Sequence, residues 1–92
     1  CGRACQAYAD FSSSSVLVKP VMGSGNMTLI TNAMVREVLT DAKTGLCTGV
    51  SYVDTQSMQE IAVNAKIVVL AASACETSRL LLNSKSSRFP NG

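Results

Sequence analysis

Three small residues that follow an apolar run are the residues of this chain best placed for chemistry. They are Ala71, Ala72 and Ser73, and the run before them is Ile67–Leu70. An apolar run of this length, rich in β-branched residues, is typical of a strand buried on both faces of a parallel sheet. Ligands of open α/β sheets bind at the carboxyl ends of such strands, and small side chains leave room there for a nucleotide cofactor. The alternative is that the alanines only let a helix pack closely on the strand.

The residues after Ala71–Ser73, here called the crossing, predict a helix. Ser73 offers an N-cap and Glu76 stands three residues later, the spacing of a capping box in which each side chain accepts a hydrogen bond from a main-chain N–H. Because a carboxylate would then occupy the positive end of the helix, we do not expect this end to bind a phosphate. Arg79 is interpreted as solvated or ion-paired rather than as a ligand anchor.

The chain before the crossing predicts an antiparallel meander. The expected strands are Thr28–Thr31, Val35–Thr40, Cys47–Asp54 and Glu60–Asn64. The segment Asp41–Gly45 is a predicted turn. Strands joined by such short connections pair antiparallel, whereas the Ile67–Leu70 run is expected in a separate, parallel sheet.

A short helix is expected near the beginning of the chain. Ser12–Ser15 precede an apolar cluster, which favours a serine-capped helix over a flexible linker. Pro20 predicts either a late start, with the proline in the first turn, or a kink. Gly23 and Gly25 then end the helix, because glycine adopts the positive φ angles that helix ends require.

Composition and charge exclude several classes of function. The 92 residues carry 8 Lys and Arg against 6 acidic residues, a net charge of +2, which supplies no basic surface for nucleic acid or membranes. No apolar run reaches the roughly 20 residues that span a bilayer, so no transmembrane segment is expected. No signal-like start is present, and the compartment is left unassigned.

The four cysteines do not have the spacing of a metal site. They are Cys1, Cys5, Cys47 and Cys75, and the chain contains no His. We therefore expect no metal ligand. The first two are expected in a loop or helix, and the last two as small buried hydrophobes.

The lone parallel strand predicts that this chain is a segment of a longer protein. A parallel strand without neighbours leaves buried main-chain groups unpaired, at about 1–3 kcal/mol each. Its partners are therefore expected in the remainder of the same polypeptide. The start at Cys1 and the turn-forming end at Pro90–Gly92 favour the same interpretation.

The order of several motifs resembles the glucose-methanol-choline (GMC) oxidoreductases, which are flavoenzymes that use FAD. The motifs are Gly25–Leu29, Asn32–Val38, Thr48–Tyr52 and Val68–Ser84. The residues that follow the second signature of the family are Ser73, Ala74, Thr77, Ser78, Leu80, Leu81 and Ser84. Lys85–Ser87 stand where that signature continues with glycines, and many members carry Gly in place of Ser73.

This resemblance implies part of an FAD-binding domain, with the meander inserted beside the last parallel strand of a Rossmann-like sheet. The implied fold class is α/β for the whole domain and α+β for this segment alone. The expected parts are a loop and short helix over 1–25, the meander over 26–65, the strand, crossing and helix over 66–84, and a loop over 85–92.

The resemblance also implies contacts with FAD. Val35 matches the position whose main chain meets the adenine, although from burial preferences alone it is a strand core residue. Ala71, Ala72 and Ser73 match the crossing, which we expect near the ribityl chain or the flavin edge. The glycine-rich fingerprint and the catalytic histidine of the family are absent, so no residue of this chain is predicted to be catalytic.

The implied activity is oxidation of an alcohol or sugar hydroxyl to a carbonyl, with hydride transfer to flavin N5 after proton loss. The implied partners are FAD and a small-molecule substrate, and the substrate and electron acceptor are left open. Two alternatives also remain open. One is a non-catalytic β-rich interaction module with the apolar run as its core, and the other is a different FAD enzyme with the same cofactor domain.

Overall fold

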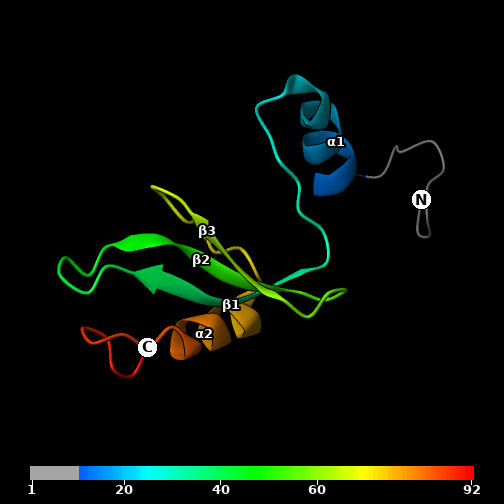
Figure 1. The fold of residues 1–92 in the computed structure, drawn as a ribbon. Helices are drawn as coiled ribbons and strands as arrows, with labels where there is room; N and C mark the ends of the chain where they lie inside the picture. Colours follow the sequence, from blue (N-terminus) through cyan, green and yellow to red (C-terminus); the bar gives the residue numbers. More distant parts are fainter. Residues whose placement is uncertain (1–10) are drawn as a thin grey trace. The chain divides into compact units, whose positions relative to one another are not determined.

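The structure is a computed structural model that describes residues 11–92, in two compact units divided after Thr31. Cys1 and Cys5, for which a loop or helix was expected, lie outside the described residues. The second unit, Asn32–Gly92, carries all the predicted site residues. Figure 1 shows the order of the elements along the chain.

The described part of the first unit contains one short helical segment with three hydrogen-bonding patterns. In chain order these are the π-helix η1 (Ser13–Val18), the α-helix α1 (Lys19–Val21) and the 3-10 helix η2 (Met22–Ser24). The predicted helix is thus confirmed, with Ser12 as its N-cap residue.

Pro20 and Gly25 shape this helix as their chemistry predicts. The Lys19 N–H still bonds to the Ser14 carbonyl in the π pattern, but Pro20 has no N–H with which to continue that pattern. The proline accordingly lies in the first turn of α1. Gly25 ends the segment with φ 74°, in the left-handed region.

The second unit is built on a three-stranded antiparallel sheet in the order β1-β2-β3. Its strands are β1 (Ala33–Thr40), β2 (Cys47–Asp54) and β3 (Glu60–Asn64). The predicted bounds of β2 and β3 are confirmed, and β1 begins two residues before the predicted Val35. The unit is α+β, because one helix, α2 (Ala74–Asn83), packs on the sheet.

The two hairpin turns are fixed by aspartate side chains. The Asp41 carboxylate accepts hydrogen bonds from the Lys43 N–H at 2.8 Å and the Thr44 hydroxyl at 3.1 Å, and both lower the pKa of that carboxyl from its ordinary 3.8. The Asp54 carboxylate accepts from the Gln56 N–H at 2.8 Å, which likewise lowers its pKa. Such Asx turns explain why the chain reverses at these two positions.

The predicted strand Thr28–Thr31 is wrong. These residues have no regular secondary structure, and the next residue, Asn32, has φ 57°. A left-handed residue interrupts an extended strand, so pairing with β2 begins only at Ala33. The side chains of Leu29 and Ile30 are 51% and 49% exposed.

The predicted strand Ile67–Leu70 is also not formed. These residues pair with no strand in the described part of the chain. The side chains of Ile67 and Val69 are 81% and 83% exposed. The physical reason is that a parallel strand needs parallel neighbours. The sheet of residues 32–92 consists of two antiparallel hairpins and contains no parallel strand.

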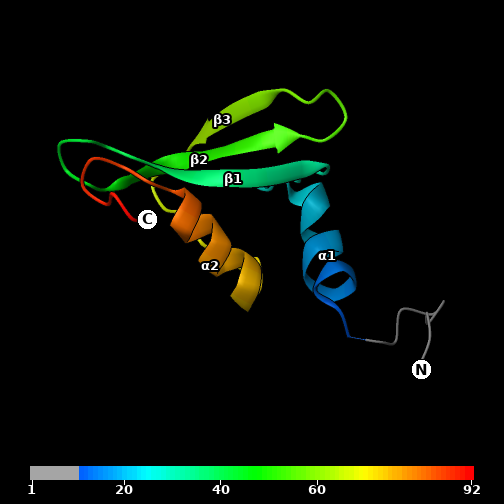
Figure 2. The same ribbon diagram turned by 90° about the horizontal axis from the view of Figure 1, so that it is seen from below.

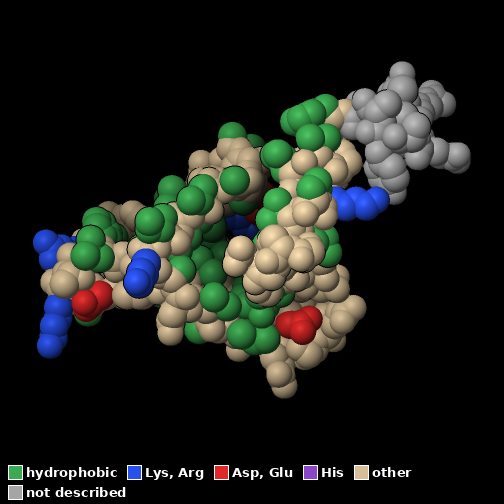
Figure 3. All heavy atoms as spheres, turned by 90° about the horizontal axis from the view of Figure 1, so that it is seen from above, with side chains coloured by type: hydrophobic (Ala, Val, Ile, Leu, Met, Phe, Trp, Pro, Cys, Tyr) green, Lys and Arg blue, Asp and Glu red, His purple; other side chains and the backbone are tan. Residues whose placement is uncertain are grey.

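The described residues bury little apolar surface. Leu80 of α2, 7% exposed, is their one buried hydrophobic residue. Figure 2 shows α2 against one side of the sheet, and Figure 3 shows hydrophobic side chains open on the face in view. No helix within residues 11–92 is long and apolar enough to cross a membrane.

Candidate functional site

Three of the four predicted cofactor residues line one cavity of about 400 Å³, here called the crossing cavity. Val35 comes from β1, while Ala71 and Ala72 come from the crossing, and the cavity places them around the same space. Its wall is completed by Val50, Ile67–Leu70 and Leu80. Ser73 is not among the lining residues. Residues 36 positions apart in the chain (71 minus 35) are thus brought together.

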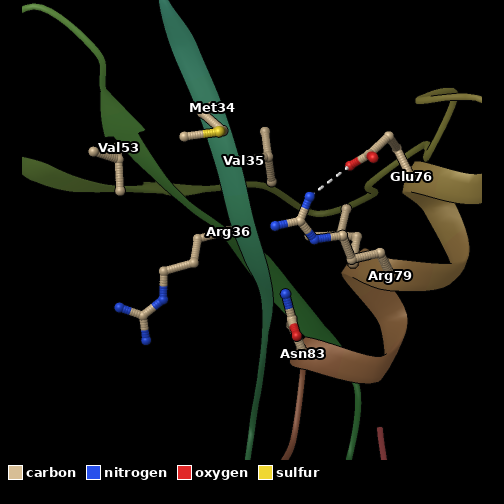
Figure 4. Close-up of a pocket in the computed structure, with 8 residues that line it drawn as sticks. Met34, Val35, Arg36, Val53, Glu76, Arg79 and Asn83 are labelled. Carbon is tan, nitrogen blue, oxygen red and sulfur yellow. Dashed lines mark ion pairs between the residues drawn. The ribbon is translucent and has the colours of Figure 1, made fainter.

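A second cavity, of about 210 Å³, lies between β1 and α2 and is here called the helix cavity. Its lining residues are Met34, Val35, Arg36, Val53, Glu76, Arg79, Leu80 and Asn83. Figure 4 shows Asn83 directed toward β1 from α2. Val35 and Leu80 line both cavities, so Val35 lies where the two spaces adjoin.

The position of β1 at the sheet edge explains why its main chain is open to a ligand. Only one side of β1 pairs with a strand of the described chain. On the other side the Val38 N–H donates to the Ser84 hydroxyl oxygen at 2.8 Å, and that hydroxyl donates to the Leu80 carbonyl at 2.7 Å. The carboxyl end of α2 is therefore attached to the edge, and the edge nearer Val35 borders the two cavities.

A β-bulge follows Val35 directly. Val35 pairs with Tyr52 and Glu37 pairs with Ser51, so Arg36 is the extra residue on β1. Bulges leave the extra residue unpaired and increase the local twist, and they are common beside functional sites. The bulge sets the direction of the main chain at Val35.

One carboxylate joins all three strands at the bulge. Glu60 of β3 accepts a hydrogen bond from Arg36 Nη1 of β1 at 2.9 Å and one from the Ser51 hydroxyl of β2 at 2.5 Å. Ser51 is buried, with 3% exposure. The Arg36 and Glu60 side chains are 54% and 45% exposed. The three residues are here called the bulge network.

The capping box predicted for Ser73 and Glu76 is wrong. Ser73 is at the N-cap position of α2 with φ 77° and ψ 167°, and its side chain makes no cap hydrogen bond. Its carbonyl accepts from the Thr77 N–H at 2.9 Å. The Glu76 carboxylate instead pairs with Arg79 Nη1 at 3.5 Å, which confirms the ion-paired interpretation of Arg79. Figure 4 shows this pair beside the helix cavity.

The conformation of Ser73 explains the failed capping box. A residue with φ near 77° and ψ near 167° lies in a region that is essentially limited to glycine. An N-cap side chain reaches the N–H of the following turn from β-region dihedrals, which Ser73 does not have. These dihedrals therefore account for the missing cap hydrogen bond.

The sequence did not predict the bulge network or Asn83. Opposite charges at Arg36 and Glu60, on the two outer strands, were the available signal. It becomes visible only once the register places both beside Ser51. Asn83 carried no signal, because a single amide on a helix is common.

The cysteines differ in exposure. Cys47 is half-buried and its thiol lies 3.6 Å from the Gly49 carbonyl oxygen. Cys75 is exposed, so its predicted burial is wrong. Cys75 lies in the first turn of α2. The helix packs on the sheet with another side, the one that contains the buried Leu80. Within residues 11–92 no three Cys, Asp or Glu side chains are grouped so as to hold a metal ion.

Comparison with known proteins gives two matches. The family model described as GMC oxidoreductase matches residues 1–88. A 2-methyl-1,2-propanediol dehydrogenase from Mycolicibacterium austroafricanum is 44% identical over 64 residues, which are 70% of this chain and 11% of that protein. The chain thus spans about a tenth of the length of this relative. No solved structure gives a significant match.

Proposed function

The chain belongs to the GMC oxidoreductase family, and on this premise we propose that it is part of an FAD-dependent enzyme that oxidises an alcohol hydroxyl to a carbonyl. The segment contributes to holding FAD. The observation that carries the proposal is the crossing cavity, in which Val35, Ala71 and Ala72 face the same space.

The residues of this segment fit part of FAD. The crossing cavity, at about 400 Å³, lies at the lower end of the roughly 300–1,000 Å³ of small-molecule sites, and the helix cavity, at about 210 Å³, is smaller than such sites. The adenine of FAD is a flat, neutral ring with hydrogen-bonding edges. Such a ring suits the open main chain of β1, which lies next to apolar side chains. We therefore assign the adenine end of FAD to β1 at Val35.

The crossing would approach another part of the cofactor. Ala71 and Ala72 have the smallest side chains in the wall of the crossing cavity, so they allow the closest approach to the main chain. Glu76, in the first turn of α2, carries a negative charge that opposes a phosphate at this helix end. Proximity to the ribityl chain or the flavin edge is therefore favoured over a pyrophosphate contact.

Bound FAD would supply the chemistry of this reaction, as the acceptor of a hydride from the alcohol carbon. This chain contains no His, so we assign none of its residues a proton-transfer step. Its residues position the cofactor and exclude water from part of its surface. The relative is named for a diol, which favours an alcohol over a sugar as the substrate class.

The interaction-module alternative has less support. Such a module must fold alone, and residues 11–92 bury one large apolar side chain, Leu80. The remaining apolar surface, including Ile67 and Val69, needs a cover. In the Rossmann-like domain that we propose, the parallel strands of the same polypeptide provide it.

The experiment is purification of the full-length protein and measurement of its flavin absorbance. We expect a bound flavin that is released as FAD on denaturation, and reduction of that flavin by a small diol. Val35→Ala is the matched variant: it should retain FAD, because the proposed contact uses the main chain. A folded full-length protein without flavin would contradict the proposal.

A further inference from the structure

We propose that Glu60 is a positioning residue for FAD, and that it acts through the bulge network rather than by touching the cofactor. By joining Arg36 and Ser51 it fixes the bulge after Val35, and so sets the main chain that would meet the adenine. This inference rests on the proposed function. It adds the residues that determine how strongly the enzyme prefers a dinucleotide flavin to a mononucleotide flavin.

A bulge needs such a fixing contact because its place on a strand is not set by main-chain pairing alone. The extra residue interrupts the ladder, and a shift of one residue along β1 would turn the neighbouring side chains to opposite faces. The register places Val35 immediately before the bulge. A bulge that moved by one residue would therefore change which main-chain groups of Val35 point out of the sheet.

The bulge network holds the extra residue from the two other strands. Arg36 is bound across β2 to Glu60 of β3 at 2.9 Å, and Glu60 is itself held by the buried Ser51 hydroxyl at 2.5 Å. Glu37, the residue after the bulge, lies 3.8 Å from Arg36 Nη2. Of these two carboxylates, Glu37 belongs to the same strand as Arg36, so the contact that ties the extra residue to another strand, and favours this place of the bulge, is the one with Glu60.

Burial argues that this arrangement serves position more than stability. Arg36 and Glu60 are both about half exposed, and exposed ion pairs contribute little to the free energy of unfolding. Ser51, in contrast, is buried, and its hydroxyl has Glu60 as its partner. The buried hydroxyl fixes the carboxylate, and the carboxylate fixes the arginine.

Glu60 and Ser51 act from outside the cavities that would hold the cofactor, whereas Arg36, the third member of the network, is among the residues that line the helix cavity. Figure 4 shows the Arg36 side chain extending away from α2, whereas Val35 lies between the strand and the helix. Glu60 and Ser51 line neither cavity. Substitution of Glu60 therefore removes no proposed contact with FAD and tests position alone.

The test measures the dissociation constants of FAD and FMN for the full-length protein after removal of its flavin. FMN lacks the adenine. We expect Glu60→Ala to weaken FAD binding by roughly 10-fold or more, since misplacement of a positioned contact by about 1 Å costs up to about 10²-fold. Binding of FMN should stay unchanged. Glu60→Gln, which keeps an acceptor for Arg36 and Ser51, should restore most of the FAD affinity.

Asp41→Ala is the matched control. Asp41 is another hydrogen-bonded carboxylate, in the turn that follows β1 at the end away from the bulge, and its loss should change neither constant. If Glu60→Ala does not fold, Ser51→Ala replaces it and should give a smaller, FAD-specific loss.

Two results would overturn the inference while leaving the proposed function intact: FAD binding to the folded variant equal to that of the wild type, or equal losses of FAD and FMN affinity. A wild-type protein that binds neither flavin would overturn the proposed function and, with it, this inference.

Discussion

The meander β1–β3 and the segment Ile67–Ser73, which ends in the crossing, are neighbours in the chain but differ in where their main-chain partners lie. Each strand of the meander pairs with the strand adjacent in sequence. The segment Ile67–Ser73 pairs with no strand of the described residues, and its Val69 side chain is 83% exposed. Local pairing can therefore be encoded in a short segment, whereas a parallel strand depends on residues far away in the chain.

The largest expected effect on stability comes from a charge placed in the Ile67–Leu70 run. If Ile67–Leu70 is a buried parallel strand of the full-length protein, Val69→Asp buries an unpaired carboxylate and should reduce the free energy of unfolding by roughly 3 kcal/mol or more. Leu46→Asp, near the β1–β2 turn and 69% exposed, should change it by less than about 0.5 kcal/mol. Denaturant unfolding of the two variants measures both changes. Equal small effects would mean that the Ile67–Leu70 run is solvated in the full-length protein.

A smaller loss is expected from substitution of Gly49 in β2. A Cβ at Gly49 would overlap the Val63 carbonyl oxygen of β3. Gly49→Ala should therefore destabilise the full-length protein by about 1–3 kcal/mol through overpacking. Gly23→Ala is the control, because no atom lies within 4 Å of its added Cβ. An unchanged melting temperature for Gly49→Ala would show that β2 and β3 separate easily.

Substitution of Ser73 should increase stability. Its dihedrals cost about 1–3 kcal/mol in a residue other than glycine, and glycine returns about 0.5–1 kcal/mol of this through its greater freedom in the unfolded chain. Ser73→Gly should gain roughly 1 kcal/mol. Ser73→Ala keeps the strain and loses a hydroxyl that makes no cap hydrogen bond, so it should change stability little. If Ser73→Ala instead lowered the free energy of unfolding by about 1 kcal/mol, the Ser73 hydroxyl would act as an N-cap after all.

The smallest expected effect is the pH dependence of the two turns. The folded-state pKa values of Asp41 and Asp54 are lowered from 3.8. Their contribution to stability is therefore complete above pH 3.8 and is lost as the pH falls below it, through the lower folded pKa. The amide chemical shifts of Lys43 and Gln56 should titrate with midpoints below 3.8. Asp41→Asn should abolish the Lys43 titration, and midpoints at 3.8 would contradict these hydrogen bonds.

The sequence predicted what depends on near neighbours. Cys47–Asp54 and Glu60–Asn64 show alternation between clear turn residues, so the bounds of β2 and β3 were found without further information. The strand predicted at Thr28–Thr31 is wrong, because the left-handed Asn32 separates these residues from β1. The same limit applies to Ser73, whose residue type indicated a cap and whose dihedrals exclude one.

The candidate site was predicted in part. A family resemblance pointed to Val35, Ala71 and Ala72, which the fold brings around one cavity. The bulge network was not predicted, because it depends on a shift in register that no residue type announces. Arg36 and Glu60 are 24 residues apart in the chain, and they meet only because the register of the three strands places both beside Ser51.

The strand order β1-β2-β3 also bears on when each part forms during synthesis. A β-hairpin closes in about 1–10 μs, whereas a ribosome adds about 5–20 residues per second. Each hairpin of the meander can therefore close before the next strand is made. The Ile67–Leu70 segment has no such partner among residues 11–92, so, as a parallel strand of the domain that we propose, we expect it to leave the ribosome unpaired. Hydrogen exchange on stalled nascent chains should show protected amides in β2 and unprotected amides at Val68, and protection at both would contradict this order.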